Sequence, residues 1–384
     1  MKLGGYEFYK SLGSPKHLVA PMVEQSELAW RLLSRKYNAH LTYTPMFHAK
    51  LFSENQKYRQ ENWIYNESDK PLIVQFCAND PACFLNAAKL VQDVACAVDL
   101  NLGCPQGIAK RGHYGAFLMD DWDTISSIVK LAHKELSIPI TCKIRIYPEL
   151  EKTIRYAKML EESGCQMLTV HGRFREQKGQ MTGIADWKQI AEVKKAVSIP
   201  VFANGNIMYY KDIEKCMEAT GVDGVMSAEG NLYNPAIFQP VQYSSWFLAE
   251  EYLDIIKQHP GSADFAQAKA HLFKIFHSAL PIYTDLREKL STVRSMEEIV
   301  EFTQAIKDRL IADYGSASIF DGEYKTDGRG VRELPVWVVQ PYIRKPLPAQ
   351  EQKKDQTIEK RKTDEQDQKK KKGTLLLTQP NWTR

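Results

Sequence analysis

The sequence lacks long apolar runs, paired cysteines, internal repeats and, except at one end, any excess of charge. No apolar run among its 384 residues approaches the ~20 that a membrane span needs. Residues 1–10 hold no apolar stretch typical of a secretion signal, so we expect no secretion and no membrane partner. The seven cysteines are scattered and none are spaced Cys-x-x-Cys. This favours reduced thiols in the cytoplasm or nucleus and no metal site.

The formal charge of +4 is confined to the C-terminal end. Residues 349–384 hold ten Lys or Arg and six Asp or Glu, so the rest of the chain is formally neutral. A nucleic-acid partner would therefore need a local basic patch. We expect this Lys-rich tail to be disordered. Its lysine run at 369–372 suits a nuclear localisation signal, an RNA-binding arm or a solvated tail equally well.

Short apolar segments alternate with amphipathic ones up to residue 227. The predicted strands are 17–22, 41–45, 71–77, 97–102, 140–146, 166–171, 200–204 and 221–227. The predicted helices between them are 26–36, with Ser26 as its N-cap, 81–94, 122–136, 151–163, 186–197 and 209–219. Eight strands alternating with helices predict a (β/α)₈ TIM barrel, with an open doubly wound sheet as the alternative.

Polar side chains gather where these strands end. They are Gln75, Asn101, Lys143, Arg145, His171 and Asn204. Side chains alternate along a strand, so Lys143 and Arg145 share one face, which we place toward the barrel interior, while Ile144 and Ile146 face the helices. Since barrel enzymes build their sites at the carboxyl ends of the strands, these residues predict an active site.

Two kinds of loop extend this prediction. Cys104 follows strand 97–102 on a glycine-rich loop, where a cysteine is placed for chemistry rather than packing. The loops after the last two strands contain Asn204, Gly205 and Asn206, and then Ala228, Glu229 and Gly230. Small residues there allow backbone N–H groups to approach an anion, which predicts a phosphate-bearing cofactor.

The chain resembles the tRNA-dihydrouridine synthases, which are FMN-dependent flavoproteins, from about residue 18 to 310. The matching stretches are Ala-Pro-Met at 20–22, Val-Gln-Phe at 74–76, Asp-Leu-Asn-Leu-Gly-Cys-Pro at 99–105, Cys-Lys-Ile-Arg at 142–145, Val-His-Gly-Arg at 170–173, Ala-Asn-Gly-Asn at 203–206 and Asn-Pro at 234–235. The chain looks most like the eukaryotic type 1 branch, which modifies uridines 16 and 17 of the tRNA D-loop. Many bacterial members have Gly-Arg-Gly where this chain has Ala228-Glu229-Gly230, so phosphate binding here should depend more on backbone amides.

The resemblance implies a role for each matching residue. Cys104 would be the general acid, and Asn101 and Arg145 would lie near the uracil. The residues implied to bind FMN are Pro21, Met22, Gln75, Lys143, His171, Asn204, Gly205, Asn206, Ala228, Glu229 and Gly230. NADPH or NADH would reduce the flavin, FMN would pass a hydride to uracil C6, and Cys104 would protonate C5. A thiol, whose ordinary pKa is near ~8.5, is still protonated at neutral pH and suits that task.

A tRNA substrate also requires basic surfaces. Lys110, Arg111, Arg173, Arg175 and Lys178 lie on loops after the predicted fourth and sixth strands, and we assign them to RNA phosphates at the barrel rim. Helices are predicted at 265–280, 281–293 and 295–311, and the resemblance makes them the tRNA-docking region. Its candidate phosphate contacts are Lys269, Lys274, Arg287, Lys289, Arg294, Lys307 and Arg309.

We therefore predict a catalytic barrel at 1–245, a helical tRNA-binding domain at 246–318, an irregular docking segment at 319–348, and the tail at 349–384. The loop predicted at 315–330 would precede an apolar segment, 335–342, that docks back. Two alternatives stay open: an FMN barrel acting on a free pyrimidine, and an RNA chaperone whose flavin chemistry is silent. We expect the protein to be a monomer.

Overall fold

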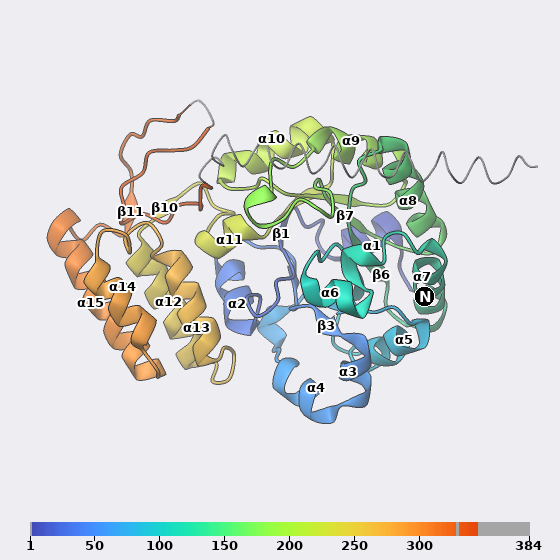
Figure 1. Ribbon diagram of the computed structural model, residues 1–384, viewed down its shortest axis with the longest axis horizontal. Helices are drawn as coiled ribbons and strands as arrows, with labels where there is room; N and C mark the ends of the chain where they lie inside the picture. Colours follow the sequence, from blue (N-terminus) through green and yellow to red (C-terminus); the bar gives the residue numbers. More distant parts are fainter. Residues whose placement is uncertain (1, 328–329, 345–384) are drawn as a thin grey trace, which may run out of the picture. The chain divides into compact units, whose positions relative to one another are not determined.

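A parallel β-barrel forms the centre of the computed structural model, which describes residues 2–327 and 330–344 (Figure 1). Neighbouring strands pair in the order β1 (His17–Val19), β9 (Gly224–Ser227), β8 (Val201–Asn204), β7 (Leu168–His171), β6 (Ile140–Arg145), β5 (Ala97–Leu102), β4 (Leu72–Cys77) and β2 (Thr42–Tyr43). A bridge from Leu18 to Leu41 joins β1 to the β2 end. The predicted barrel is confirmed, and the open sheet was wrong. The short β3 (Phe47–His48), which was not predicted, pairs with the end of β4.

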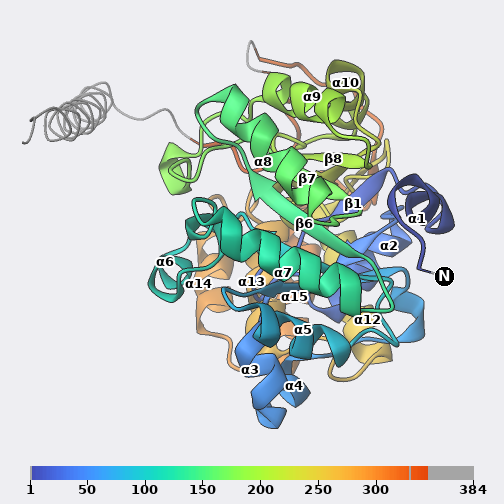
Figure 2. The same ribbon diagram turned by 90° about the vertical axis from the view of Figure 1, so that its right-hand side faces the viewer.

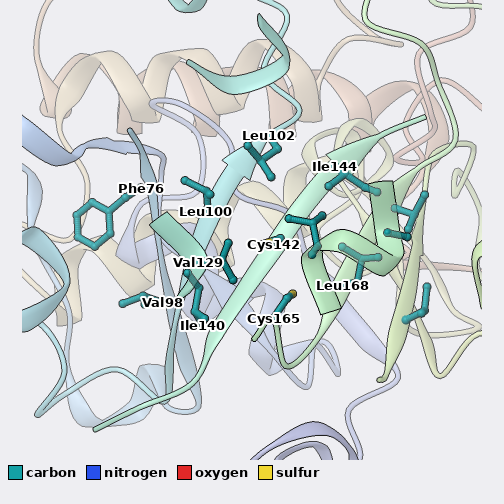
Figure 3. Packing of buried hydrophobic residues seen from close by; sticks show 14 of the residues in the cluster. Phe76, Val98, Leu100, Leu102, Val129, Ile140, Cys142, Ile144, Cys165 and Leu168 are labelled. Atoms are coloured by element: carbon teal, nitrogen blue, oxygen red, sulfur yellow. The ribbon is translucent and has the colours of Figure 1, made fainter. Parts of the chain in front are cut away.

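The alternation along β6 sorts apolar side chains from polar ones. Ile140, Cys142 and Ile144 pack into the layer between sheet and helices, where Figure 3 shows them beside Leu100 and Leu168. Lys143 and Arg145 face the other way, into the barrel, as predicted. The strand can therefore bury one apolar face and still present two cations to the interior.

The barrel is closed at the amino ends of its strands. Phe8 and Tyr9 of α1 (Gly5–Ser11) pack with interior residues such as Met167 and Phe202. The Tyr9 hydroxyl donates to the Asp223 carbonyl just before β9. Only the carboxyl end of the barrel is left for ligands.

Helices surround the barrel, and Figure 2 shows α7 and α8 outside β6. Their bounds are α2 (Leu28–Lys36), α3 (Ala49–Glu54), α4 (Gln56–Asn62), α5 (Pro81–Lys89), α6 (Gly107–Gly112), α7 (Trp122–Glu135), α8 (Leu150–Glu162), α9 (Trp187–Ala196), α10 (Tyr210–Thr220) and α11 (Glu229–Tyr233), with 3₁₀ turns at Glu67–Asp69, Gly115–Phe117 and Gly179–Met181. Asp80, Asp121 and Asp186 begin α5, α7 and α9 by accepting a backbone N–H. No helix in these described ranges is long and apolar enough to cross a membrane.

A second core joins the barrel to the later helices, α12 (Ser245–Gln258), α13 (Phe265–Ile275), α14 (Thr284–Thr292) and α15 (Met296–Tyr314). Trp30 and Leu33 of α2 are buried in this core with Leu272 and Phe302. The apolar segment after Pro335 docks here too, as predicted, since Val338 is buried in the same core. The described residues up to Tyr342 form one compact unit, and the divisions at 245 and 318 stay predictions.

Several predicted details were wrong. Ser26 does not cap α2; its hydroxyl instead bonds the backbone of Met22. The predicted helix 81–94 ends at Lys89, and α15 continues to Tyr314. Ile319–Phe320 (β11), within the predicted loop, pairs antiparallel with Gln242–Tyr243 (β10). The Lys-rich tail at 349–384 lies wholly outside the described residues.

A buried ion pair ties α2 to the turn before β4. Arg31 donates from Nε to Asp69 Oδ2 at 2.8 Å, and both side chains are almost fully buried. We expect Arg31→Ala to lower the free energy of unfolding by about 3–5 kcal/mol, because the Asp69 charge would stay buried without its main partner. Urea denaturation measures this. Lys57→Ala, which removes an exposed partner of Glu61, is the control and should stay within about 0.5 kcal/mol of the original protein.

Candidate active site

The polar residues predicted at the strand ends lie side by side around the barrel mouth. Strand register places Asn101 opposite Lys143, Arg145 opposite His171, and His171 opposite Asn204. Gln75 is opposite Asp99 one layer deeper. The structure therefore brings together all the strand-end residues that the sequence singled out.

Asn101 holds the loop that carries Cys104. Its Oδ1 accepts the backbone N–H groups of Gly103 at 3.1 Å and Cys104 at 2.9 Å. The Cys104 carbonyl accepts the Ala116 N–H at 3.1 Å. A Cβ on Gly115, whose φ is +61°, would lie 2.8 Å from that carbonyl oxygen, so glycine is needed there. Cys104 itself is half-buried on this loop.

Lys143 is a buried cation held by a neutral group. Its Nζ donates to Asn204 Oδ1 at 3.0 Å, and Asn204 Nδ2 donates to the Met226 carbonyl at 2.8 Å. Within the described ranges Lys143 forms no ion pair. Burial and the neighbouring Arg145 charge lower the pKa of Lys143 to about 8, against the opposing charge of Asp99. An anion at the mouth would stabilise its protonated form.

His171 is neutral, and its tautomer is fixed. Arg173 Nη1 lies 3.0 Å from His171 Nε2, and since an arginine can only donate, the ring proton must be on Nδ1. Burial and the charges of Lys143, Arg145 and Arg173 hold the pKa of His171 well below its usual value. The imidazole is therefore neutral, with its single N–H at Nδ1.

Arg145 connects two loops of the mouth. Its Nε donates to the Gly103 carbonyl at 2.8 Å, and its Nη1 donates to the carbonyls of Phe174 at 2.7 Å and Gln177 at 3.0 Å. Burial and the nearby Arg173 charge lower the pKa of Arg145 to about 10. The guanidinium thus sits beside the Cys104 loop and fixes it to the loop after β7.

The loops after β8 and β9 carry the two glycines that were predicted to let backbone N–H groups approach an anion. Gly205 has a φ of +112°, and a Cβ there would lie 2.7 Å from the Ala185 Cβ. A Cβ on Gly230 would lie 2.2 Å from the Ile207 carbonyl oxygen. Ala228 and Glu229 lead into α11 directly before it. Both glycines are therefore required by packing, and both are buried. The predicted approach of an anion to their backbone stays a prediction.

Met22 follows Pro21 at the end of β1 and lies where three apolar cores meet. The Ser26 hydroxyl holds it, accepting its N–H at 3.0 Å. This turn fixes the Met22 backbone just after β1, and its contact with the flavin ring stays a prediction.

The predicted cationic rim divides into three groups. Lys110 and Arg111 are exposed on α6, as expected of RNA contacts. Arg175 instead pairs with Asp120 at 2.9 Å and with Glu176, and Lys178 donates to the Pro105 carbonyl at 3.0 Å. Arg173 turns inward, donating to Asn206 Oδ1 at 2.7 Å beside the loop after β8.

The sequence did not assign Asp99 or Thr141 to the site. Asp99 lies opposite Gln75 and accepts its Nε2–H at 2.8 Å, and the Thr141 hydroxyl donates to Asp99 at 2.6 Å. The sequence pattern could have indicated Asp99, because it shares a strand face with Asn101 and a carboxylate on a face that points into the barrel needs hydrogen-bond partners.

Comparisons with known proteins agree with this geometry. A family model described as Dihydrouridine synthase (Dus) matches residues 18–311. The mouse protein "tRNA-dihydrouridine(16/17) synthase [NAD(P)(+)]-like" is 54% identical over 349 residues, covering 89% of this chain and 71% of that protein. The Saccharomyces cerevisiae tRNA-dihydrouridine(16/17) synthase [NAD(P)(+)] is 47% identical over 367 residues, covering 89% and 87%. The human tRNA-dihydrouridine(20a/20b) synthase [NAD(P)+]-like protein is 38% identical over 239 residues, covering 62% and 74%.

Gly115→Ala tests whether the loop geometry fixes Cys104. We expect a loss of about 1–3 kcal/mol in unfolding free energy, since the new methyl overlaps the Cys104 carbonyl. We also expect a changed rate of Cys104 alkylation by iodoacetamide, followed by peptide mass spectrometry. Gly179→Ala is the matched control, because φ is +57° there and a Cβ would meet nothing within 4 Å. Equal alkylation rates in both variants would contradict the expectation.

Proposed function

The chain belongs to the dihydrouridine synthase family, and on this premise we propose that its barrel mouth reduces uridines 16 and 17 of the tRNA D-loop to 5,6-dihydrouridine. The protein is a flavin-dependent oxidoreductase that takes its electrons from NAD(P)H and acts on tRNA. The sequence identities of two groups of relatives support the choice of positions 16 and 17. Relatives named for these positions are 46–54% identical, whereas the human protein named for 20a/20b is 38% identical.

One observation carries the proposal. A half-buried thiol, Cys104, lies on the loop between two polar strand ends, beside Arg145 and Lys143. Reduction of the uracil C5–C6 bond needs one hydride and one proton. The thiol supplies a proton donor at the place where the strand ends offer charge and hydrogen bonds to a polar ring.

The residues present fit FMN. The two loops around Gly205 and Gly230 would offer backbone N–H groups to the phosphate. Arg173, which donates to Asn206, adds a cation next to Gly205. Lys143 and neutral His171 would offer polar atoms to the ring system and ribityl chain, and Met22 would lie against the ring. Gln75 is fully buried, with its amide bonded to Asp99 and Asn101, so its contact with FMN stays a prediction. Bound FMN supplies the hydride that uracil C6 receives.

The chain's own residues then bind, orient and protonate. The target uridine must turn out of the folded tRNA to reach the mouth. Arg145 and Asn101 orient the uracil, and the protonated Lys143 ammonium stabilises negative charge that develops on the ring carbonyl. The Cys104 thiol, placed by Asn101, gives its proton to C5.

The direct test incubates purified protein anaerobically with unmodified tRNA transcript, FMN and NADPH. Nuclease digestion and mass spectrometry should show a gain of about 2 Da at D-loop uridines 16 and 17.

Cys104→Ala should retain flavin and tRNA binding and lose at least about a hundredfold in single-turnover rate. Cys83→Ala, at another half-buried cysteine, is the control.

Two outcomes would favour the alternative functions. Turnover of free uracil or orotate, with no mass gain in any tRNA, would replace the proposal by the free-pyrimidine alternative. Faster refolding of tRNA by flavin-free protein, without any gain, would replace it by the chaperone alternative.

A second prediction concerns the helical region. Lys307 and Arg309 pair with Glu250 and Asp285, and Lys269 donates to carbonyls at the end of α14. Arg287, Lys289 and Arg294 are exposed at α14, so we propose them as the tRNA phosphate contacts.

Changing Arg287, Lys289 and Arg294 together to Gln should reduce the slope of log Kd for tRNA against log salt by about two to three. The matched control is Gln at Lys188, Lys211 and Lys215, three exposed lysines on α9 and α10. This control removes the same charge from another surface, and an equal loss of slope in both triples would exclude a specific contact at α14.

A further inference from the structure

We propose that Asp99 is a positioning residue, whose carboxylate acts through Gln75 and Asn101 to orient the loop of Cys104. No described contact joins Asp99 to Cys104 directly, so the effect is transmitted by the two amides. The inference rests on the proposed role of Cys104 where it concerns turnover, but the orientation of the loop can be tested without it.

An unbroken chain of hydrogen bonds supports this proposal. Gln75 Nε2 donates to Asp99 Oδ2 at 2.8 Å, and Asn101 Nδ2 donates to Gln75 Oε1 at 2.7 Å. Asn101 Oδ1 then accepts the Cys104 N–H at 2.9 Å. The side chains of Gln75, Asp99 and Asn101 are all buried, so water cannot replace a lost bond.

The direction of the chain is set at Asp99. An ionised carboxylate can only accept, so it forces the NH₂ end of Gln75 toward itself and the carbonyl end toward Asn101. Asn101 must then present its own NH₂ to Gln75 and its oxygen to the loop. If either amide turned over, two NH₂ groups or two oxygens would face each other. The carboxylate therefore specifies which atom meets the Cys104 backbone.

The groups around Asp99 set the pH at which this control operates. Thr141 on β6 and Gln75 on β4 donate hydrogen bonds to Asp99, the first at 2.6 Å, and Lys143 on β6 contributes a positive charge. Tyr43 on β2 and Cys142 on β6 also lie near Asp99, whose negative charge raises the pKa of both. Burial dominates and raises the pKa of Asp99 to about 6. Below this pH the carboxyl group gains an O–H donor and no longer specifies the amide orientation.

The test compares the whole protein with Asp99→Asn, which keeps size and shape but can donate as well as accept. Single-turnover reduction of tRNA by pre-reduced enzyme should fall about tenfold to a hundredfold above pH 6, with the dissociation constant for tRNA within about threefold. The unchanged protein should lose rate as the pH falls through about 6, and this fall, the acid limb of its pH–rate profile, should be absent from Asp99→Asn.

The stability of Asp99→Asn is a further check, and the variant should be no less stable than the unchanged protein at pH 7.5. The folded-state pKa of Asp99 lies above its ordinary value, so its contribution to stability is lost as the pH rises through about 6. An unchanged rate and acid limb would overturn the proposal.

Thr141→Val is the second variant. It removes the other hydrogen bond to Asp99 but leaves the chain from Gln75 to Cys104 in place. Because that bond lowers the pKa of Asp99, its loss should move the acid limb to higher pH and leave the rate at high pH unchanged. An acid limb that does not move would show that Asp99 is not the group responsible.

A third measurement does not depend on flavin or turnover. It compares Cys104 alkylation by iodoacetamide in the unchanged protein and in Asp99→Asn, both free of flavin. At each pH the rate in the unchanged protein is divided by the rate in Asp99→Asn. The ratio should differ from one above pH 6 and approach one below it, where both proteins lack the carboxylate charge. A ratio of one throughout overturns the positioning role. If Cys104→Ala keeps its turnover while this ratio changes as expected, the proposed catalysis fails and the positioning stands.

Discussion

The site depends on one constraint: several charges must share the dry interior of a barrel. Lys143 and Arg145 face inward from one strand, and burial lowers the pKa of both. Asp99 below them is the counter-charge, and burial raises its pKa to about 6. Keeping Asp99 ionised at neutral pH costs the fold on the order of 3 kcal/mol relative to an ordinary carboxyl group. An anionic ligand at the mouth lowers the energy of the cations, so affinity for anions is built into the unliganded protein.

Amide side chains distribute this charge without adding to it. Asn204 holds the Lys143 ammonium, Asn101 holds the Cys104 loop, and Asn206 accepts from Arg173. Each amide oxygen accepts from a cation or an N–H group, and the NH₂ groups of Asn101 and Asn204 donate to Gln75 and to the Met226 carbonyl. A carboxylate in any of these places would form an ion pair with the neighbouring cation and weaken its effect on a ligand. The site is therefore preorganised by neutral groups, with its positive potential directed at the mouth.

The sequence predicted the barrel and the strand-end residues because both follow from local pattern. Alternation along 140–146 was enough to place Lys143 and Arg145 inside and Ile144 outside. Contacts between distant segments were not predictable in this way. The pairing of β10 with β11 joins residues far apart in the chain, and the inward turn of Arg173 depends on Asn206 being beside it. Ser26 looked like a cap because its spacing to α2 was suitable, but the nearby Met22 backbone takes its hydroxyl.

Helix α2 belongs to the barrel by sequence order and to the helical region by packing. Trp30 stacks on His271 of α13 with ring centroids 3.8 Å apart, and its Nε1 donates to Asn231 beside Gly230. Tyr252 of α12 donates to Glu27 at the start of the same helix. The helical region is consequently not an exchangeable module. A chimera that joins this barrel to the later helices of a relative would have to carry α2 along with them, and would also have to match Leu232 of α11, which is buried in the same core.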